Sequence, residues 1–507
     1  MKNQLKAGAV ISYLNLLIGN IIPFIYTPIM LRLLGQAEYG LYGIANSIMG
    51  YIGLLNFGIG GTIVRYLSKY RAAGDREQEA RVAGLFLKIY SAVCVLILTA
   101  GFVFAANVQV YSRSLLPDEV ERLRILVILM TLNTAVFLPF SVFNSIVIAY
   151  ERYIFSKLVG VLATVLSPVL HLILLYLGYG SVGLVLGSTL LNFVTYSLYT
   201  WYALGRLKLR PSFRPAEPGL LREILKFSAF VFLATMVDTL YWTTDKLIIG
   251  WAKGTKDTAV YNIGATFNTY VTGLSSAISG LLIPKLTQMA VKDVPKEEFT
   301  RIFIKVGRLQ FLIVSFIVSA FVAFGRQFIA LWAGPAYAQA YYVALLTMIP
   351  VTIPLIQNTG INILYALNRH QFRSVLYSCI AVLNVALTFW WVEKYGIIGA
   401  AAATCLAYVI GNILIINWYY HRRIGIDIPL FWQNILKMSP VMVIMGTAAW
   451  FVLDTLTLDS WLTFFAAAAV YTAVYFALAY VFMLNPSERD LIREPLTRVL
   501  KKRKRSK

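Results

Sequence analysis

The chain has 507 residues, of which 59% are hydrophobic and 13% are charged, and its mean hydropathy is +0.70. This composition excludes an ordinary water-soluble globular protein, whose surface needs more charge. The formal charge of +22 would suit a nucleic-acid-binding protein if the lysines and arginines clustered on one folded surface, but they fall in short breaks between apolar runs, so no nucleic-acid partner is expected.

Fourteen apolar runs are long enough to span a membrane, which needs about 20 mostly apolar residues per helix. They predict an all-α polytopic membrane protein. In chain order they cover residues 7–34, 39–63, 83–106, 125–148, 157–177, 182–204, 227–249, 260–283, 303–324, 341–366, 374–392, 397–419, 435–453 and 461–484. We expect an N-terminal six-helix lobe (1–204), a cytoplasmic linker (205–223) and a C-terminal six-helix lobe (224–420). Accessory helices 13 and 14 (421–484) and a basic cytoplasmic tail (485–507) should follow.

The first predicted helix follows the basic segment Met1–Lys6 and is longer than a signal-peptide core, so it should remain as a membrane span. Prolines inside it free backbone carbonyls, which are tolerated where they face protein or water, so the helix is expected to be bent and gate-like. Its candidates for cavity lining or ion coupling are Asn15, Asn20, Tyr26 and Arg32. Kinks that serve only packing, and an Arg32 that reaches the outer headgroups, are the alternatives.

Two further helices each contain one ionisable residue. Lys88 lies one or two turns into the third helix and His171 lies within the fifth. A lone ionisable group in a span is a functional candidate because it is costly to keep in hydrocarbon. The alternatives are that Lys88 reaches the cytoplasmic interface and that His171 is a satisfied core residue.

The seventh helix carries the most unusual pattern. Asp238, Tyr241, Trp242 and Asp245 recur at intervals of three and four, which predicts one helical face, with Lys246 beside it. A carboxylate in hydrocarbon needs a polar cavity, a partner or a cation, so Asp238 is the first candidate for substrate lining or coupling. The alternatives are that Asp245 and Lys246 are solvated near the outer interface and that Asp238 only ties two helices together.

An internal repeat covers most of the chain. Leu126–Leu170 aligns with Val343–Leu387 without a gap, and weaker matches upstream place Tyr26 and Gly35 on Tyr241 and Gly250. Six helices separate the copies, an even number, so both copies should have the same orientation in the membrane. Parallel repeats favour an alternating-access transporter with a cavity between two lobes. A duplication in a protein that transports nothing would leave the same trace.

The basic residues predict how the chain is oriented. Most of the 45 lysines and arginines fall in the even-numbered loops and at both ends, so both termini should be cytoplasmic. In these loops Arg65, Arg152 and Arg369 are candidates for contact with an anionic headgroup such as a pyrophosphate, although such residues more often only set topology. The basic end of the chain, Lys501–Lys507, should lie against anionic lipids.

No metal, nucleotide or catalytic motif stands out. The three cysteines lie far apart in apolar stretches, no HExxH-like pair occurs, and no Gly-rich loop ends in Gly-Lys-Ser/Thr. We therefore expect no metal site, no catalytic residues and no cofactor other than a coupling cation, H⁺ or Na⁺.

Two motif regions resemble one transporter family. The segments are Leu34–Gly35, Glu38–Tyr42, Asn56–Gly61, Val64–Tyr66 and Ala73–Asp75 in the first region, and Asp238–Leu240 and Asp245–Gly250 in the second. At these segments the chain is similar to the polysaccharide transporter family. This family comprises the O-antigen, capsule and teichuronic-acid flippases of the multidrug/oligosaccharidyl-lipid/polysaccharide exporter superfamily. The resemblance implies alternating-access transfer of a lipid-linked oligosaccharide, typically on undecaprenyl pyrophosphate, from the inner to the outer leaflet of a bacterial or archaeal cytoplasmic membrane, with polysaccharide polymerase machinery as a candidate partner. Family members tend to have a cationic lumen, whereas clear intramembrane cations are few here.

Three other functions fit parts of the pattern less well. A lipid II flippase has the same fourteen-helix plan, whereas a cation-coupled multidrug exporter usually has twelve helices. A membrane-embedded glycosyltransferase or polymerase would need a large outward loop and acidic catalytic pairs, but the longest outward loops, near residues 107–124 and 325–340, are short. The chain is therefore not expected to be an enzyme.

Overall fold

The computed structural model describes residues 2–490 apart from 112, 281–285, 287, 290, 291, 293, 370, 456, 457 and 459, and it describes side chains from residue 18 onward apart from those residues and 230, 274–280 and 454. The described part is almost entirely helical and contains no strand, which confirms an all-α fold. The last residues of the predicted basic tail, 491–507, lie outside the described residues.

Contacts divide the chain into two compact units. Unit 1 comprises Met1–Asn262 and Ala381–Ala400, and unit 2 comprises Ile263–Ile380 and Ala401–Lys507. These boundaries follow packing and differ from the predicted lobe boundary at residues 205–223, which follows the sequence repeat. The division into six-helix lobes stays a prediction.

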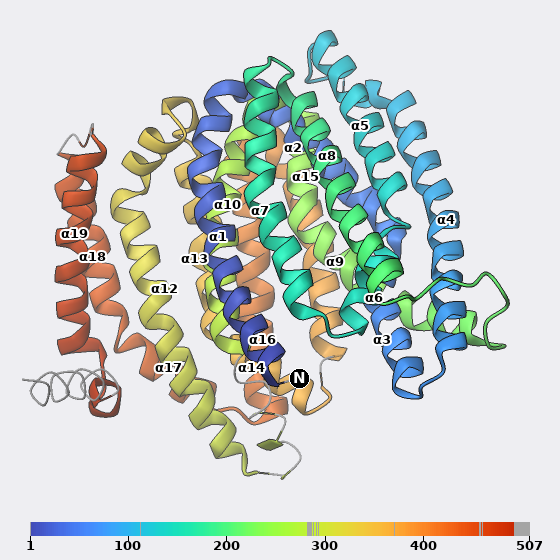
Figure 1. Cartoon of the computed structure of the whole chain (residues 1–507). Helices are drawn as coiled ribbons and strands as arrows, with labels where there is room; N and C mark the ends of the chain where they lie inside the picture. The colour runs from blue at the N-terminus through green and yellow to red at the C-terminus, as the bar shows by residue number, and fades with distance from the viewer. Residues whose placement is uncertain are drawn as a thin grey trace, which may run out of the picture. The chain divides into compact units, whose positions relative to one another are not determined.

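In unit 1, α1 packs against α7, α4 against α5, α7 against α8, and α2 against both α5 and α9 (Figure 1). The helices that begin in this unit are α1 (Lys2–Leu34), α2 (Gln36–Gly53), α3 (Ile59–Ala72), α4 (Arg76–Ala106), α5 (Pro117–Phe137), α6 (Ser141–Ala149), α7 (Tyr153–Tyr176), α8 (Gly180–Trp201), α9 (Leu220–Lys253) and α10 (Thr255–Gly280).

In unit 2 the long helix α12 is the centre of packing and contacts α13, α14, α17, α18 and α19. The helices are α12 (Lys296–Trp332), α13 (Ala340–Ile356), α14 (Asn358–Ala366), α16 (Ile416–Tyr419), α17 (Ile428–Leu436), α18 (Ser439–Asp454) and α19 (Trp461–Leu478). Helix α15 (Gln371–Tyr408) begins and ends in unit 2, and its middle, Ala381–Ala400, belongs to unit 1.

The described part is a multi-pass membrane protein by length and composition. Seven of its helices are long and apolar enough to cross a membrane, or up to ten if each of three bent helix pairs is one span. One of the seven, Gln371–Ile424, runs for 54 residues, but Gly396 interrupts it with φ 60° and ψ −142°, so two helices meet there. The count of fourteen spans stays a prediction.

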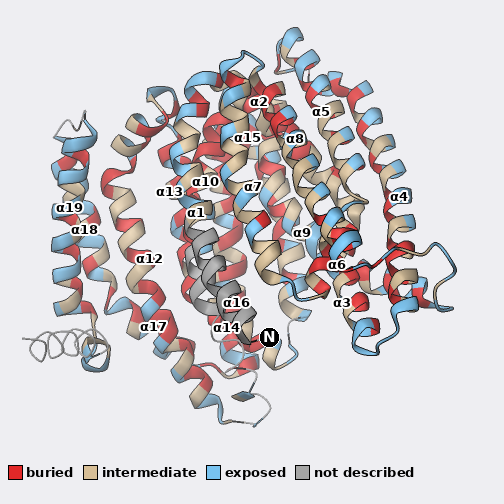
Figure 2. Cartoon of the chain, viewed as in Figure 1, coloured by how far each residue is buried: buried red, intermediate tan, exposed pale blue. Residues whose placement is uncertain are grey.

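The helices carry large apolar side chains on exposed as well as buried faces, and exposed positions recur along most of them (Figure 2). Trp390, Phe193 and Leu462 are each more than 60% exposed. A water-soluble protein would bury such residues, whereas lipid accepts them. Buried apolar residues form a continuous core in unit 1 that includes Phe86 and Tyr66.

Local structure agrees with the predicted repeat. Helices α6 and α14 have the same length, begin and end at positions that the gapless register pairs, and each continues a preceding helix after a bend of 43° or 44°. Each is followed by a residue with positive φ, Glu151 at 56° and Asn368 at 55°. A helix commonly ends with a left-handed residue of this kind because it lets the last carbonyls find donors.

Two further pairs follow the repeat. Phe155 stacks on Tyr202 with ring centroids 4.0 Å apart, and Phe372 stacks on Tyr419 at 3.9 Å. Gly180 and Gly396, which pair when the register slips by a single position, both have positive φ. The sequence register thus corresponds to repeated local packing.

The weaker upstream register is wrong by one helical turn. Helices α1 and α9 end at Leu34 and Lys253, and a positive-φ glycine follows each. Gly35 therefore matches Gly254 rather than Gly250, and Tyr26 matches Asp245. A slip of one turn keeps the same helical face, so apolar periodicity alone does not detect it.

Candidate functional site

A buried carboxylate in unit 1 is surrounded by hydrogen-bond donors from two other helices. Asp245 on α9 is 3% exposed. The Tyr261 hydroxyl of α10 donates to its Oδ2 at 2.6 Å, and the Thr388 hydroxyl of α15 donates to its Oδ1 at 2.9 Å. The Asn384 amide, one turn before Thr388, lies 3.5 Å from the same Oδ1. These hydroxyl groups replace the hydration that the carboxylate loses on burial, and the burial does not fit the alternative that Asp245 is solvated.

The other predicted residues of the seventh helix lie in different surroundings. Tyr241 is buried and its ring meets that of the exposed Trp242 edge to face. Asp238 is exposed, and Lys246 is half-buried. Asp238 and Asp245 are two turns apart on nearly the same face, so they differ in depth along the helix rather than in direction.

A second polar chain joins α1, α7 and α8. The Tyr26 hydroxyl lies 3.3 Å from His171 Nδ1, and His171 Nε2 lies 3.1 Å from the Ser188 hydroxyl. A Cβ atom at Gly187 would come within 2.6 Å of His171 Cδ2, so this glycine makes room for the imidazole. His171 thus has a polar partner on each side.

These two clusters occupy equivalent places in the repeat. Tyr26 matches Asp245 by the helix-end register, and His171 matches Thr388 by the gapless register. Each pair joins the first helix of a copy to its fifth. Among the predicted residues, the structure therefore brings Tyr26 and His171 into contact.

A cavity of about 190 Å³ lies among α2, α5 and α8 in unit 1. It is lined by Tyr42, Asn46, Met49, Met130, Asn133, Thr134, Val185, Ser188 and Asn192. Asn192 Nδ2 donates to Asn133 Oδ1 at 2.8 Å, and Asn133 Nδ2 donates to Thr189 Oγ1 at 2.7 Å. Ser188 connects this cavity to His171.

Sequence reasoning missed several residues that complete these clusters, among them Asn46, Asn133, Asn192, Asn384 and Thr388. All five lie inside predicted spans, and their signal is a polar side chain within an apolar run. Such residues are common enough that their importance emerges only when several helices bring them together.

The remaining intramembrane candidates differ in their surroundings. Asn20 and Arg32 are exposed on α1, and the side chain of Asn15 lies outside the described residues. Lys88 donates to the Phe213 carbonyl at 2.7 Å, and the Ser212 amide of the same linker donates to the Ala80 carbonyl at 2.8 Å. Lys88 therefore ties the linker to α4.

The three headgroup candidates are all exposed. The Arg65 guanidinium lies 4.8 Å from the centre of the Phe227 ring. Arg152 and Arg369 occupy equivalent positions just after α6 and α14, and Arg369 Nη1 donates to the Arg423 carbonyl at 3.2 Å. Arg152 is also the N-cap residue of α7, so the two arginines lie in the short connections between consecutive helices.

At the predicted outer end of unit 1, contacts join segments of the two repeat copies. Arg113 forms an ion pair with Glu393 at 2.9 Å, and its guanidinium lies 4.7 Å from the centre of the Trp251 ring. The Thr255 hydroxyl donates to Glu119 Oε1 at 2.8 Å. Both side chains of the ion pair are at least half exposed, so the pair contributes roughly 0–1 kcal/mol.

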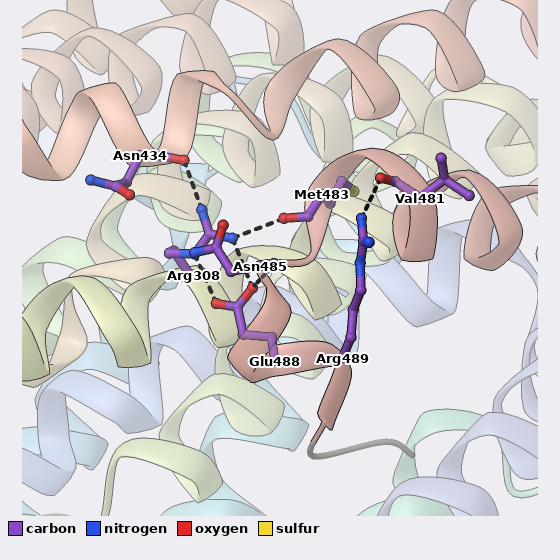
Figure 3. Close-up of polar contacts among 7 residues, drawn as sticks. All are labelled: Arg308, Asn434, Val481, Met483, Asn485, Glu488 and Arg489. Carbon is purple, nitrogen blue, oxygen red and sulfur yellow. Dashed lines mark hydrogen bonds and ion pairs between the residues drawn. The ribbon is translucent and has the colours of Figure 1, made fainter.

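Unit 2 contains a buried arginine clasp (Figure 3). Arg308 on α12 has a side chain 5% exposed and bonds Glu488 through Nε and Nη2, each at 2.8 Å. Its Nη2 also donates to the Met483 carbonyl at 2.8 Å, and its Nη1 to the Asn434 carbonyl at 3.3 Å. The clasp fastens the segment after α19 to α12 and α17.

The same clasp changes the acidity of Glu488. Burial alone raises the pKa of this carboxyl, but the hydrogen bonds from Arg308 and the Asn485 amide, with the charges of Arg308 and Lys305, outweigh burial and hold the pKa below its ordinary value. A cavity of about 590 Å³ adjoins the clasp. Its lining carries as many acidic as basic side chains: Glu297, Asp427 and Glu488 against Arg301, Lys305 and Arg308.

More than half of the chain matches one protein family. Residues 5–290 match the family described as Polysaccharide biosynthesis protein. The chain is 20% identical over 400 residues to the "Putative O-antigen transporter" of Shigella flexneri, covering 78% of this chain and 92% of the relative.

Solved structures share the fold. The lipid II flippase MurJ in an inward closed conformation superposes with a TM-score of 0.70 at 16% identity, over 96% of this chain and 99% of that one. An inward-facing multidrug resistance MATE family transporter of the MOP superfamily superposes with a TM-score of 0.61 at 17% identity, over 82% of this chain and 95% of that one. A MOP superfamily transporter from Pyrococcus furiosus superposes with a TM-score of 0.57 at 17% identity, over 85% of this chain and 97% of that one.

Proposed function

Because the chain belongs to the polysaccharide biosynthesis protein family, as a polysaccharide transporter of the MOP superfamily, we propose that it flips a lipid-linked oligosaccharide from the inner to the outer leaflet. We propose that the carrier is undecaprenyl pyrophosphate and that the mechanism is alternating access. The chain would lie in a cytoplasmic membrane, with both chain ends on the cytoplasmic side. Family and neighbours are transporters or flippases rather than enzymes.

One observation carries the proposal: polar contacts within the helices occur at equivalent places in both repeat copies, half-buried between Tyr26 and His171 and buried between Asp245 and Thr388. Polar groups inside a membrane are costly and mark substrate or ion pathways. Two equivalent polar contacts between the first and fifth helices of each copy support a translocation path built by duplication.

Asp245 and Asp238 are the proposed coupling residues, with H⁺ or Na⁺ as the cation. Asp245 has the buried, donor-rich setting in which a change of charge would alter packing, because three side chains are arranged around it. Asp238, exposed on the same helix two turns away, can meet substrate or cation directly. Alternating access would require two contacts to break during each cycle: the ion pair of Arg113 with Glu393 and the hydrogen bond from Thr255 to Glu119.

Three further proposals follow the family. Anionic lipids would hold the basic end of the chain. Polysaccharide polymerase machinery would receive the product. Arg65, Arg152 and Arg369 would contact the anionic headgroup before transfer, since all three are exposed and guanidinium suits a pyrophosphate.

The test uses the purified full chain in proteoliposomes that carry a fluorescent undecaprenyl-pyrophosphate oligosaccharide in one leaflet. We expect the label to become accessible from the other side only with the protein present, and deletion of the gene to reduce surface polysaccharide. Lipid II serves as the competing substrate. Faster movement of lipid II, or unchanged surface polysaccharide with no movement of the oligosaccharide, would overturn the proposal.

A further inference from the structure

We propose that the cavity among α2, α5 and α8 is a binding subsite for uncharged sugar rings, which it holds through their hydroxyl groups. The subsite rests on the proposed function, because the sugar rings would belong to the lipid-linked oligosaccharide. The oligosaccharide would present them to unit 1 while its carrier remains in the lipid.

Three helix faces build the cavity. Tyr42, Asn46 and Met49 are spaced four and three residues apart on α2, which places them on one face. Helix α5 contributes Asn133 and its neighbours, and helix α8 contributes Ser188 and Asn192, one turn apart. Amides from three helices therefore converge on one space of about 190 Å³.

The amides are held in place before any ligand arrives. Asn192 donates one N–H to Asn133 at 2.8 Å, and Asn46 donates one N–H to the Tyr42 carbonyl of its own helix at 2.9 Å. Asn46 also hydrogen-bonds the Tyr42 side chain. A side-chain amide has two N–H donors and a carbonyl acceptor, so each of these side chains keeps a carbonyl acceptor beyond the bonds that orient it. A preorganised site loses less entropy on binding.

The charge of the lining selects the ligand class. None of the nine lining residues is an acid, a lysine, an arginine or a histidine. A phosphate calls for arginine or lysine, and an organic cation calls for a carboxylate or an aromatic cage. A sugar hydroxyl is both donor and acceptor, which amide, serine and threonine groups match, while Met49, Met130 and Tyr42 offer apolar surface to the ring.

A purely structural role accounts for only part of this arrangement. Asn133, Asn192 and Thr189 join α5 to α8, as polar residues often do between membrane helices. Asn46 belongs to a third helix and donates to its own backbone, so this bond does not join helices. As a lining residue, Asn46 can offer its carbonyl oxygen to a sugar hydroxyl.

The experiment measures sugar binding by saturation-transfer NMR and titration. The full chain is placed in lipid nanodiscs that are free of glycoside detergents, since those would occupy a sugar site. The probes are N-acetyl-D-glucosamine, methyl β-D-glucopyranoside and methyl β-D-galactopyranoside, with glucose 1-phosphate as the charged analogue. We expect at least one uncharged probe to bind and glucose 1-phosphate to bind more weakly.

The variants are Asn46→Ala and Asn192→Ala. Loss of one neutral hydrogen bond should weaken binding about threefold to tenfold for each variant. The matched control is Asn107→Ala, because Asn107 makes the same bond to the carbonyl four residues before it, at 2.8 Å, but does not line the cavity. It should bind as the wild type does. Asn192→Ala also removes a hydrogen bond between helices, so this variant could fail to fold. Asn46→Ala removes only bonds within α2 and then provides the test.

The outcomes separate this inference from the proposed function. If the wild type flips the lipid-linked oligosaccharide but no uncharged probe binds, or if binding survives both alanine variants, the subsite is wrong and the flippase stands. If the probes bind in a manner sensitive to Asn46 while no lipid-linked oligosaccharide moves, the subsite stands and the flippase is wrong.

Discussion

Asp245, a proposed coupling residue, is a carboxylate that is costly to bury. Its carboxylate is removed from water, and hydroxyls from α10 and α15 replace the hydration it loses. Tyr26, at the equivalent place in the first copy, has a neutral hydroxyl and contacts a histidine instead. The two copies have therefore diverged chemically while keeping the same helix contact, which is the asymmetry expected when one copy carries the coupling ion.

Replacing each acid by its amide tests this assignment. We expect Asp245→Asn to lower transport at least tenfold while the protein still folds, because asparagine has the same shape, so that one of the two surrounding hydroxyls can donate to its carbonyl and the other can accept from its amide N–H. Asp238→Asn should also impair transport without affecting membrane insertion. Proteoliposome transport and size-exclusion chromatography measure the two effects. Undiminished transport by either variant removes that residue from the coupling site.

The Arg308 clasp gives a prediction about stability. Arg308→Ala should destabilise unit 2 by about 3–5 kcal/mol, because it removes the buried guanidinium and leaves the Glu488 carboxylate, whose side chain is 19% exposed, without its partner. Arg301→Ala is the matched control on the same helix, since its pair with Glu298 is exposed and should contribute roughly 0–1 kcal/mol. Thermal unfolding measures both, and equal losses would contradict a buried clasp.

The clasp should also respond to acid. Since the folded-state pKa of Glu488 lies below its ordinary value of 4.5, the stability it contributes is complete above pH 4.5 and is lost as the pH falls through the lowered pKa. The melting temperature of the wild type should therefore fall in that range more steeply than that of Glu488→Gln. Parallel curves would show that Glu488 does not contribute in this way.

At the scale of elements, the repeat is visible as local geometry. The short helices α6 and α14, the left-handed residues after them and the stacked rings of Phe155 with Tyr202 and Phe372 with Tyr419 all recur. Stacked rings and helix ends fix where a helix turns, so selection on packing keeps them after most side chains have changed.

Gly396 divides α15 into two helices, and its conformation should be essential. With φ 60° and ψ −142°, it lies in a region open almost only to glycine, so Gly396→Ala should destabilise the protein by about 1–3 kcal/mol. Gly61→Ala is the control, because Gly61 is helical within α3 and a Cβ there meets nothing within 4 Å. That change should be neutral or stabilising by about 0.4–1 kcal/mol. Thermal unfolding compares the two variants, and equal melting temperatures would contradict a glycine requirement at this break.

At the scale of the whole molecule, the proposed alternating access requires parts of the two repeat copies to separate and rejoin. The ion pair of Arg113 with Glu393 is suited to this, because an exposed pair is weak enough to open in every cycle. A stronger contact at this place would hold the predicted outer end shut.

Charge reversal tests the role of this pair. Arg113→Glu should lower transport severalfold with little change in melting temperature, and the double variant Arg113→Glu with Glu393→Arg should restore it. The control is Arg124→Glu, since Arg124 pairs with Glu121 inside α5 and joins no two copies. Failure of the double variant to recover transport, with the protein intact, would show that the ion pair is not part of the transport cycle.

The sequence by itself determined the membrane environment, the all-α class, the family and the gapless register of the repeat. The environment, the class and the register follow from composition, from the length of apolar runs and from repeated spacing within one chain, all of which are local properties, whereas the family came from the resemblance of two motif regions. It also selected His171, Tyr26 and Asp245, because ionisable and polar groups are conspicuous in apolar runs.

Only the tertiary structure decided which of these residues act together. It joined Tyr26 to His171 and Asp245 to Thr388, assigned Lys88 to the linker, and gathered Asn46, Asn133 and Asn192 around one cavity. The physical reason is that helical periodicity fixes the face of a residue on its own helix, whereas the partner of that face depends on how distant helices pack.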